Sequence, residues 1–168
     1  MPVCAPTRRQ LLALALPAMA ASSAKALEAG APAPTLKLGG LSGVVDLAAL
    51  SGLLVYVDFW ASWCAPCRQS FPWMNDLQVR HHAQGLRVVA VKVDTRRADA
   101  ERFLAANPAR FVIAFDDQGD TPRRWEITTM PSSALVGRDG RLLWMHRGFR
   151  HADRRDLDAR VLAALGAR

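Results

Sequence analysis

Cysteine is scarce in this chain. Cys4, Cys64 and Cys67 are the only three among 168 residues. Cys4 precedes the N-terminal apolar run rather than following it, which disfavours a lipid-anchor cysteine, and we interpret it as incidental. Once the N-terminus is removed, Cys64 and Cys67 remain alone, with no other thiol to mispair with in an oxidising compartment.

Acidic residues are missing from the N-terminus. Residues 1–26 contain the basic pair Arg8-Arg9, an uncharged apolar run from Leu11 to Ala21 and the small-x-small sequence Ala24-Lys25-Ala26. This pattern is typical of an export signal peptide that is cleaved after Ala26. The apolar run is far shorter than the roughly 20 residues of a membrane span, so an uncleaved anchor is the weaker alternative.

Two further features of the signal stay open. Ala18-Met19-Ala20 offers an earlier cleavage site, and Thr7 to Leu12 resembles a twin-arginine signal. The export route is therefore either the general secretory one or the twin-arginine one.

The net charge of +7 does not by itself indicate a binding partner for the protein. Arg8, Arg9 and Lys25 precede the cleavage point, so removing these three positive charges lowers the net charge of the mature chain to +4. The remaining arginines are spread along predicted helices, and no recognisable nucleic-acid-binding module accompanies them. We interpret them as a solvated basic surface and expect no nucleic-acid partner.

The most informative stretch is a Cys-x-x-Cys motif between a strand and a helix. An apolar strand ends at Trp60, Cys64 lies in the following turn, and Cys67 lies one helical turn further on. A helix N-terminus has unpaired N–H groups and a partial positive charge, which stabilise a thiolate and lower its pKa. Pro66 suits the first helical turn, where its missing N–H leaves no partner unsatisfied. The motif predicts redox chemistry.

The pattern along the chain predicts an α/β fold. A linker at residues 27–35 precedes one domain at 36–168, and 51% hydrophobic residues suffice for its core. Alternating strands and helices, closed by a hairpin and a helix, are typical of a sandwich with helices on both sides of a sheet. The expected strands are 36–38, 44–47, 53–60, 86–93, 111–115, 132–136 and 142–147, and the expected helices are 64–82, with a kink at Pro72, 98–107, 119–127 and 152–165. The last helix has an apolar stripe of Leu157, Val161, Leu162 and Leu165.

Asp58-Phe59-Trp60-Ala61-Ser62-Trp63-Cys64-Ala65-Pro66-Cys67 closely resembles the thioredoxin active site. The resemblance continues through most of residues 35–166 and implies the thioredoxin fold, an α/β/α sandwich with a mixed central sheet. Two additions separate the chain from thioredoxin itself: the N-terminal β-hairpin and a helix–strand insertion at residues 98–115. Together with the export signal, they resemble the periplasmic TlpA/ResA/CcmG branch of thiol–disulfide oxidoreductases.

The resemblance implies separate roles for the two cysteines. Cys64, the more exposed thiol in the resembling fold, attacks a client disulfide, and Cys67 resolves the mixed disulfide. A zinc site would need two more ligands, and the histidines show no suitable spacing. A Sco-type copper module would have three residues between its cysteines, and a peroxiredoxin would have threonine where Ala61 stands. The histidines are His81, His82, His146 and His151.

Asp58 is the third candidate catalytic residue. Ionising a carboxyl group on a buried strand is costly, so its pKa is expected to rise. In thioredoxins the matching aspartate lies behind the second cysteine, which implies that Asp58 deprotonates Cys67. The alternative is a structural carboxylate at a strand end. Lys92, inside the next strand, does not match the family's lysine, and we leave it out of the site.

Met130-Pro131 and Trp63 are the candidate substrate-binding residues. A proline that opens a strand is structurally ordinary. The resemblance implies a cis bond before Pro131, beside the disulfide, with Met130 pairing with the substrate backbone. Trp63 is expected to flank the site as an apolar contact surface. Trp60 is expected in the core, and Trp73, Trp125 and Trp144 are expected to serve packing.

The sequence therefore predicts an exported enzyme that exchanges the Cys64–Cys67 disulfide with protein thiols. The resemblance implies a reductant in the periplasm, acting on cytochrome c or copper-site clients and supplied by a membrane thiol electron donor. We expect a monomer without a cofactor. The alternative is a non-catalytic module that uses the groove beside Met130 to bind a client or a metal chaperone.

Overall fold

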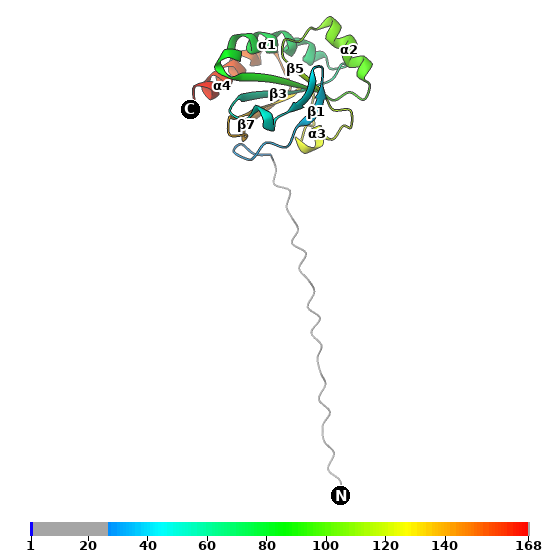
Figure 1. Cartoon of the computed structure of the whole chain (residues 1–168), viewed down its shortest axis with the longest axis vertical. Coiled ribbons are helices and arrows are strands. Elements are labelled where there is room, and N and C mark those ends of the chain that lie inside the picture. Colours follow the sequence, from blue (N-terminus) through cyan, green and yellow to red (C-terminus); the bar gives the residue numbers. More distant parts are fainter. Residues whose placement is uncertain (2–26, 168) are drawn as a thin grey trace.

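The computed structural model describes residue 1 and residues 27–167, which form a sheet covered by helices (Figure 1). The elements are β1 Lys37–Gly40, β2 Gly43–Asp46, β3 Leu54–Trp60, α1 Ala65–His81, β4 Leu86–Lys92, α2 Arg97–Ala106, β5 Val112–Phe115, α3 Thr121–Arg124, β6 Ser132–Val136, β7 Leu142–Arg147 and α4 Arg154–Gly166. Short 3-10 turns lie at Ala48–Leu50, His82–Gln84 and His151–Asp153.

The sheet has seven strands in the order β2-β1-β5-β4-β3-β6-β7. The central strands β3, β4 and β5 are parallel, whereas β6 pairs antiparallel with β3, and β7 with β6. The β1–β2 hairpin extends the other edge, with β1 antiparallel to β5. The mixed sheet, the added hairpin and the inserted α2–β5 unit confirm the fold expected from the sequence.

The two faces of the sheet pack against different elements. Tyr56 and Trp60 of β3 share a core cluster with Cys64, Cys67 and residues of α1, α2 and α4; we call this side the cysteine face. Alternate residues of β3 and β4 point the other way, toward Trp125 at the end of α3; we call this side the valine face. Its β3 and β4 members are Val55, Val57, Phe59, Val89 and Val91.

Strand β3 runs through the centre of the domain. All seven of its residues are buried, as expected for a parallel strand covered on both sides. Side chains alternate between the two faces along a strand, so Asp58 lies on the cysteine face with Tyr56 and Trp60. The active-site loop leaves the end of this strand and leads directly into α1.

Three predicted features of the helices need adjustment. The helical part of 119–127 is restricted to Thr121–Arg124, and the closing helix begins as a 3-10 turn at His151. Leu162 was expected in the buried stripe of α4 but is 49% exposed. One residue corresponds to about 100° of helix rotation, so Val161 faces the core and Leu162 turns toward solvent. Pro72 lies inside α1, and the kink there stays a prediction.

The segment before β1 lies against the domain. Gly30 N–H donates to the Leu142 carbonyl at 2.7 Å, and Ala33 N–H donates to the Gly140 carbonyl at 3.0 Å. Residues 27–35, expected as a linker, therefore run beside the turn between β6 and β7. The predicted signal peptide, residues 1–26, lies outside the described residues apart from Met1. Within the described part, no helix has the length and apolar character to cross a membrane.

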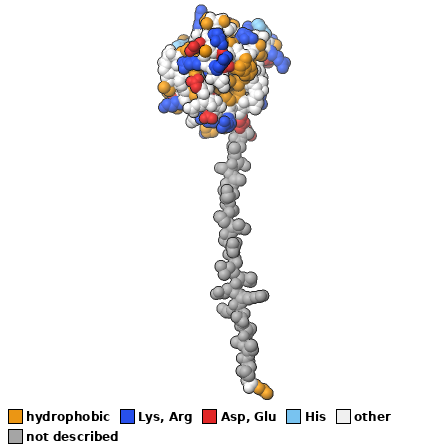
Figure 2. All heavy atoms as spheres, turned by 90° about the vertical axis from the view of Figure 1, so that its right-hand side faces the viewer, with side chains coloured by type: hydrophobic (Ala, Val, Ile, Leu, Met, Phe, Trp, Pro, Cys, Tyr) orange, Lys and Arg blue, Asp and Glu red, His pale blue; other side chains and the backbone are white. Residues whose placement is uncertain are grey.

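Charges of both signs mix on the surface. Figure 2 looks at the right-hand side of Figure 1 and shows Lys and Arg side chains interspersed with Asp and Glu. Some of these side chains form ion pairs within a single helix, such as Arg97 with Glu101 at 3.5 Å in α2. Such exposed pairs contribute at most about 1 kcal/mol each.

Candidate active site

Cys64 and Cys67 form a disulfide at the N-terminus of α1. The sulfurs are 1.98 Å apart and the Cα atoms 5.3 Å apart. Cys64 is the N-cap residue of the helix, and its Sγ accepts the Cys67 N–H at 3.2 Å. When the bond is reduced, this N–H and the helix terminus stabilise a thiolate at Cys64. Cys64 is 3% exposed and Cys67 is fully buried, so solvent reaches the disulfide only through a small exposed area of Cys64.

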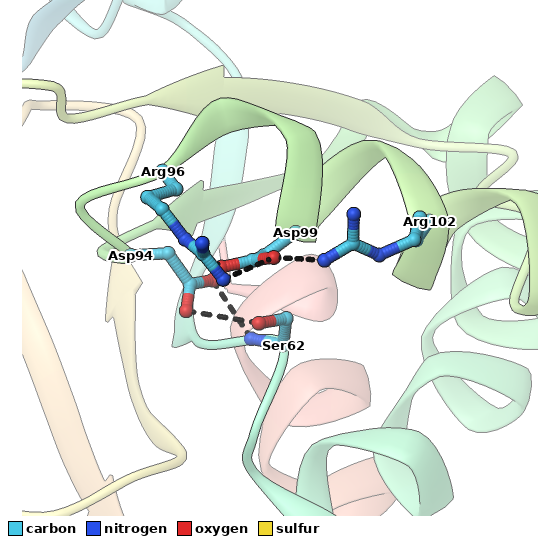
Figure 3. A network of polar contacts seen from close by, with 5 residues as sticks. All are labelled: Ser62, Asp94, Arg96, Asp99 and Arg102. Carbon is cyan, nitrogen blue, oxygen red and sulfur yellow. Dashed lines mark hydrogen bonds and ion pairs between the residues drawn. The ribbon is translucent and has the colours of Figure 1, made fainter.

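The loop before Cys64 is clamped to the end of β4. Asp94 accepts the Ser62 backbone N–H at 2.7 Å and its hydroxyl at 3.0 Å (Figure 3). Asp94 itself is buried. Because β3 and β4 are parallel neighbours, their carboxyl ends meet at one edge, and the clamp joins the segments that follow them.

A second polar cluster lies next to this clamp. Asp99 of α2 accepts from both Arg96 and Arg102 (Figure 3). Sequence reasoning missed the Ser62–Asp94 clamp. The sequence did contain a hint of it: Ser62 follows the buried strand β3, and Asp94 follows the buried strand β4.

Asp58 is buried with one oxygen unpartnered. Its side chain is 2% exposed, and Oδ2 has no hydrogen-bond partner among the described residues. Burial raises the pKa of Asp58 well above its ordinary value, because the charged form loses its hydration. By strand alternation Asp58 lies on the same face of the sheet as Cys67, and its role as the base for Cys67 stays a prediction.

Tyr56 is the polar neighbour of Asp58 on β3. Its hydroxyl donates to the Ser133 hydroxyl at 2.7 Å. Burial, and then the nearby Asp58 carboxylate, raise the pKa of Tyr56, while the Ser133 hydrogen bond acts in the opposite direction. Tyr56 therefore stays protonated and serves as a donor.

The Met130–Pro131 peptide is cis. Phe59 lies opposite Ser132 in the β3–β6 ladder, so Met130-Pro131 lies beside the residues that lead from β3 into the active-site loop. Pro131 is buried, and its carbonyl accepts the Gly148 N–H at 2.8 Å. Met130 is half-buried and packs against the cluster that contains both cysteines.

Trp63 differs from the other tryptophans. It is 69% exposed and directly precedes Cys64, where an apolar contact surface was expected. Trp60 and Trp125 are fully buried, Trp73 nearly so, and Trp144 is half-buried and stacked on His146, as expected of packing residues.

A family model and several relatives match this chain. The model of the Redoxin family matches residues 28–161. The chain belongs to the Redoxin family. Thiol-disulfide oxidoreductase ResA of Bacillus cereus is 27% identical over 128 residues, which cover 76% of this chain and 74% of that protein. ResA of Oceanobacillus iheyensis is 29% identical over 135 residues, which cover 77% and 70%.

A solved structure gives a higher identity. A protein from Chlorobium tepidum, assigned as a thiol:disulfide interchange protein DsbE, is 51% identical, with a TM-score of 0.82 over 83% of this chain and 99% of that one. With the Cys64–Cys67 disulfide, these likenesses make this Redoxin protein a thiol–disulfide oxidoreductase of the ResA/DsbE type. Its clients are proteins that carry dithiols or disulfides.

In this Redoxin protein, Lys92, His81 and His146 make their described contacts with residues other than the two cysteines. Lys92 lies opposite Trp60 rather than Asp58, and its fully buried Nζ is 3.7 Å from Asp117 Oδ1. His81 Nδ1 contacts Gln84 at 3.3 Å, and His146 Nε2 is 3.5 Å from Asp153. Among the described residues, no three His, Cys, Asp or Glu side chains gather as a metal site would require.

Proposed function

We propose that the protein is exported and reduces disulfides of client proteins in the periplasm. The observation that carries this proposal is a Cys64–Cys67 pair at a helix N-terminus, with the buried carboxyl of Asp58, whose Oδ2 has no described partner, on the same face. A nucleophile activated by the helix and a buried base together suit a dithiol that gives up electrons and protons.

The reaction has two exchange steps. The Cys64 thiolate attacks one sulfur of the client disulfide, a Cys64–client bond forms, and the other client sulfur leaves as a thiolate that takes a proton from water. Asp58 then accepts the Cys67 proton, and the Cys67 sulfur attacks Cys64. The Cys64–Cys67 bond forms, the second client thiolate leaves, and two electrons have passed to the client.

Trp63, Met130 and Pro131 are proposed to bind the client. Trp63 offers an exposed apolar surface beside Cys64. Met130 lies two residues before β6, where its backbone can pair with an extended client segment. Such backbone pairing is independent of client sequence and suits a substrate defined by its disulfide.

Export and electron supply complete the proposal. Residues 1–26 direct export, and cleavage after Ala26 leaves Leu27 as the first residue of a monomer. The clients are haem-binding cysteines of cytochrome c or cysteines of copper sites, kept reduced in an oxidising compartment. A membrane thiol donor regenerates the dithiol. N-terminal sequencing of protein from the producing cell tests the cleavage, and a chain that still begins near Met1 contradicts it.

Trapping of clients tests the cysteine roles. In Cys67→Ser, Cys64 is expected to hold clients as stable mixed disulfides, because no internal thiol resolves them. Cys64→Ser is expected to trap few. The two variants are compared by non-reducing electrophoresis after exposure to disulfide-bonded insulin, with reduction of insulin by the intact protein as the positive control. Equal trapping by both variants would remove the assignment of nucleophile and resolver.

The reduction potential tests the direction of transfer. We expect a value nearer about −270 mV, as in thioredoxin, than about −120 mV, as in a strong oxidant. Thiol alkylation in living cells is expected to find Cys64 and Cys67 mainly reduced. A potential above roughly −150 mV with the pair mainly oxidised in the cell would make the protein an oxidase of exported proteins.

A further inference from the structure

Three polar residues lie in a row across the cysteine face. Asp58 of β3 lies directly opposite Ser133 of β6, and Ser133 lies directly opposite His146 of β7. Opposed side chains on one face of an antiparallel pair have Cβ atoms about 5 Å apart. The row leads from the buried strand beside the cysteines to the edge strand of the sheet.

Each member of the row has hydrogen-bonding capacity left over. Ser133 accepts from Tyr56, and its own hydroxyl hydrogen has no described acceptor. Asp58 Oδ2 and His146 Nε2 are also buried without a hydrogen-bond partner. Buried polar groups in folded proteins are nearly always satisfied, and no direct hydrogen bond joins the three described side chains. The two unsatisfied groups therefore point to water between the members of the row.

The outer end of the row reaches solvent. One ring nitrogen of His146 is buried, but a quarter of its side chain is exposed. Asp153, which precedes α4, lies 3.5 Å from Nε2. Trp144 stacks on the ring with centroids 5.4 Å apart and holds its orientation.

Other charged groups also surround this end of the row. Arg160 lies over Trp144, and Arg154 lies over Phe149. Asp158 of α4 is already bonded to Trp73 and Arg80 of α1. The charged groups that contact His146 or the ring stacked on it are therefore Asp153 and Arg160.

We propose that Ser133 and His146 form the route by which Asp58 exchanges its proton with solvent. This rests on the proposed role of Asp58 as the base for Cys67. Asp58 gives its proton to the Ser133 hydroxyl as Ser133 passes its own proton to His146, each transfer passing through one water. His146 then releases a proton to a buffer base in solution. No electrons move, and each residue ends the cycle in its starting form.

The route matters because the disulfide side is closed. Cys67 is fully buried and Cys64 nearly so, which leaves little access for water to Asp58 from the client side. A client docked over Trp63 would close that side further. A separate exit at the β7 edge lets Asp58 lose its proton while the client is bound.

Stopped-flow measurement of the two exchange steps tests this route. His146→Phe keeps a ring to stack on Trp144 but cannot carry a proton, and His146→Gln is a second variant in case the first folds poorly. In weak buffer, resolution by Cys67 is expected to slow roughly tenfold while attack by Cys64 stays unchanged. Added imidazole is expected to restore resolution, since it accepts the proton in place of the missing side chain. His151→Gln, an exposed histidine outside the row, is the matched control.

The outcomes distinguish failure of the proton route from failure of the proposed base role of Asp58. If the His146 variants resolve as fast as the unchanged protein in weak buffer, the route is wrong. Slow resolution that imidazole does not restore also overturns it and assigns His146 a packing role. If Asp58→Asn itself resolves at the normal rate, the base role of Asp58 fails, and the route fails with it. Slow Asp58→Asn together with normal His146 variants overturns the route alone.

Discussion

The two faces of the sheet differ in what they bury. Apart from the half-buried Arg87, the β3 and β4 residues of the valine face are aliphatic or aromatic, whereas the cysteine face holds Asp58 and Lys92, both with buried atoms lacking a hydrogen-bond partner. Every other residue of the two strands is buried. The valine face shows that the centre of this sheet can be built almost without polar groups. The cysteine face instead buries ionisable groups beside the redox pair, at a cost in folding free energy.

That cost is substantial. Burying an ionisable group without partners usually costs several kcal/mol or forces it to stay neutral. The valine face instead gains about 1.5–3 kcal/mol for each large apolar side chain removed from water. We infer that one face mainly stabilises the fold and the other mainly carries the reaction. The following substitutions test that division, beginning with the largest expected effect.

Phe59→Ala is expected to lower the free energy of unfolding by about 3–5 kcal/mol. Phe59 is fully buried on the valine face, with its ring centroid 5.5 Å from that of Trp125. Urea denaturation measures the loss, and Phe59→Leu, which keeps most of the volume, should cost about 1 kcal/mol. Insulin reduction per folded molecule should be unchanged. A parallel loss of turnover would break the division between the faces.

Asp58→Asn is expected to stabilise the protein at neutral pH and slow resolution. Burial raises the folded pKa of Asp58 above the unfolded one, so the stabilising contribution of its protonated form is complete below the unfolded pKa. That contribution is lost as pH rises from the unfolded pKa through the folded pKa, at about 1.4 kcal/mol for each pH unit between the two.

The advantage of Asp58→Asn over the unchanged protein should therefore grow with pH. Urea denaturation across a range from acidic to alkaline pH measures it, with Asp76→Asn, at an exposed position of α1, as the control. An advantage that stays constant with pH would show that Asp58 has the same pKa in the folded and unfolded states, which contradicts the raised pKa. Turnover that stays normal from pH near 6 to pH near 9 would make Asp58 purely structural.

Lys92→Met is expected to leave stability unchanged or raise it by about 2 kcal/mol. The Lys92 ammonium is fully buried, and its ion-pair partner Asp117 is largely exposed, so the pair regains little of the desolvation cost. Lys37→Met, which removes an exposed lysine paired with Asp46, should change stability by less than about 0.5 kcal/mol. Thermal denaturation compares the two. Strong destabilisation by Lys92→Met would mean that the buried charge supports the fold.

Ser62→Ala is expected to cost about 1–2 kcal/mol, because one hydrogen bond to the Asp94 carboxylate is lost while the backbone bond remains. Ser42→Ala, at an exposed turn of the hairpin, is the control and should cost almost nothing. The same variants report on the site through the rate of attack by Cys64. An unchanged stability in Ser62→Ala would mean that the backbone bond alone holds the loop.

The sequence predicted the strands and the redox pair well. A buried strand such as β3 is a nearly apolar run bounded by turn residues, and the Cys-x-x-Cys motif between strand and helix is a local signal. Asp58 was also found locally, since a lone charge in an apolar run is conspicuous. These features depend on neighbours in the chain.

What the sequence missed depends on distant pairs. The Ser62–Asp94 clamp joins residues 32 positions apart, and the Asp58–Ser133–His146 row exists only once the register of three strands is known. A slip of one residue would place each side chain on the other face. Leu162 shows the same limit on a helix, where the width of a buried stripe depends on what packs against it.

Trp63 gives this protein an optical sensor of its own redox state. Its indole is the one largely exposed among the five tryptophans, and it adjoins Cys64 in the chain. Disulfides quench excited indoles by accepting an electron, whereas thiols do so more weakly. Emission from Trp63 should therefore brighten when Cys64–Cys67 is reduced and dim when a client reoxidises it. An aqueous quencher such as iodide would reach this indole before the buried ones, so electron flow through the protein could be followed without any attached dye.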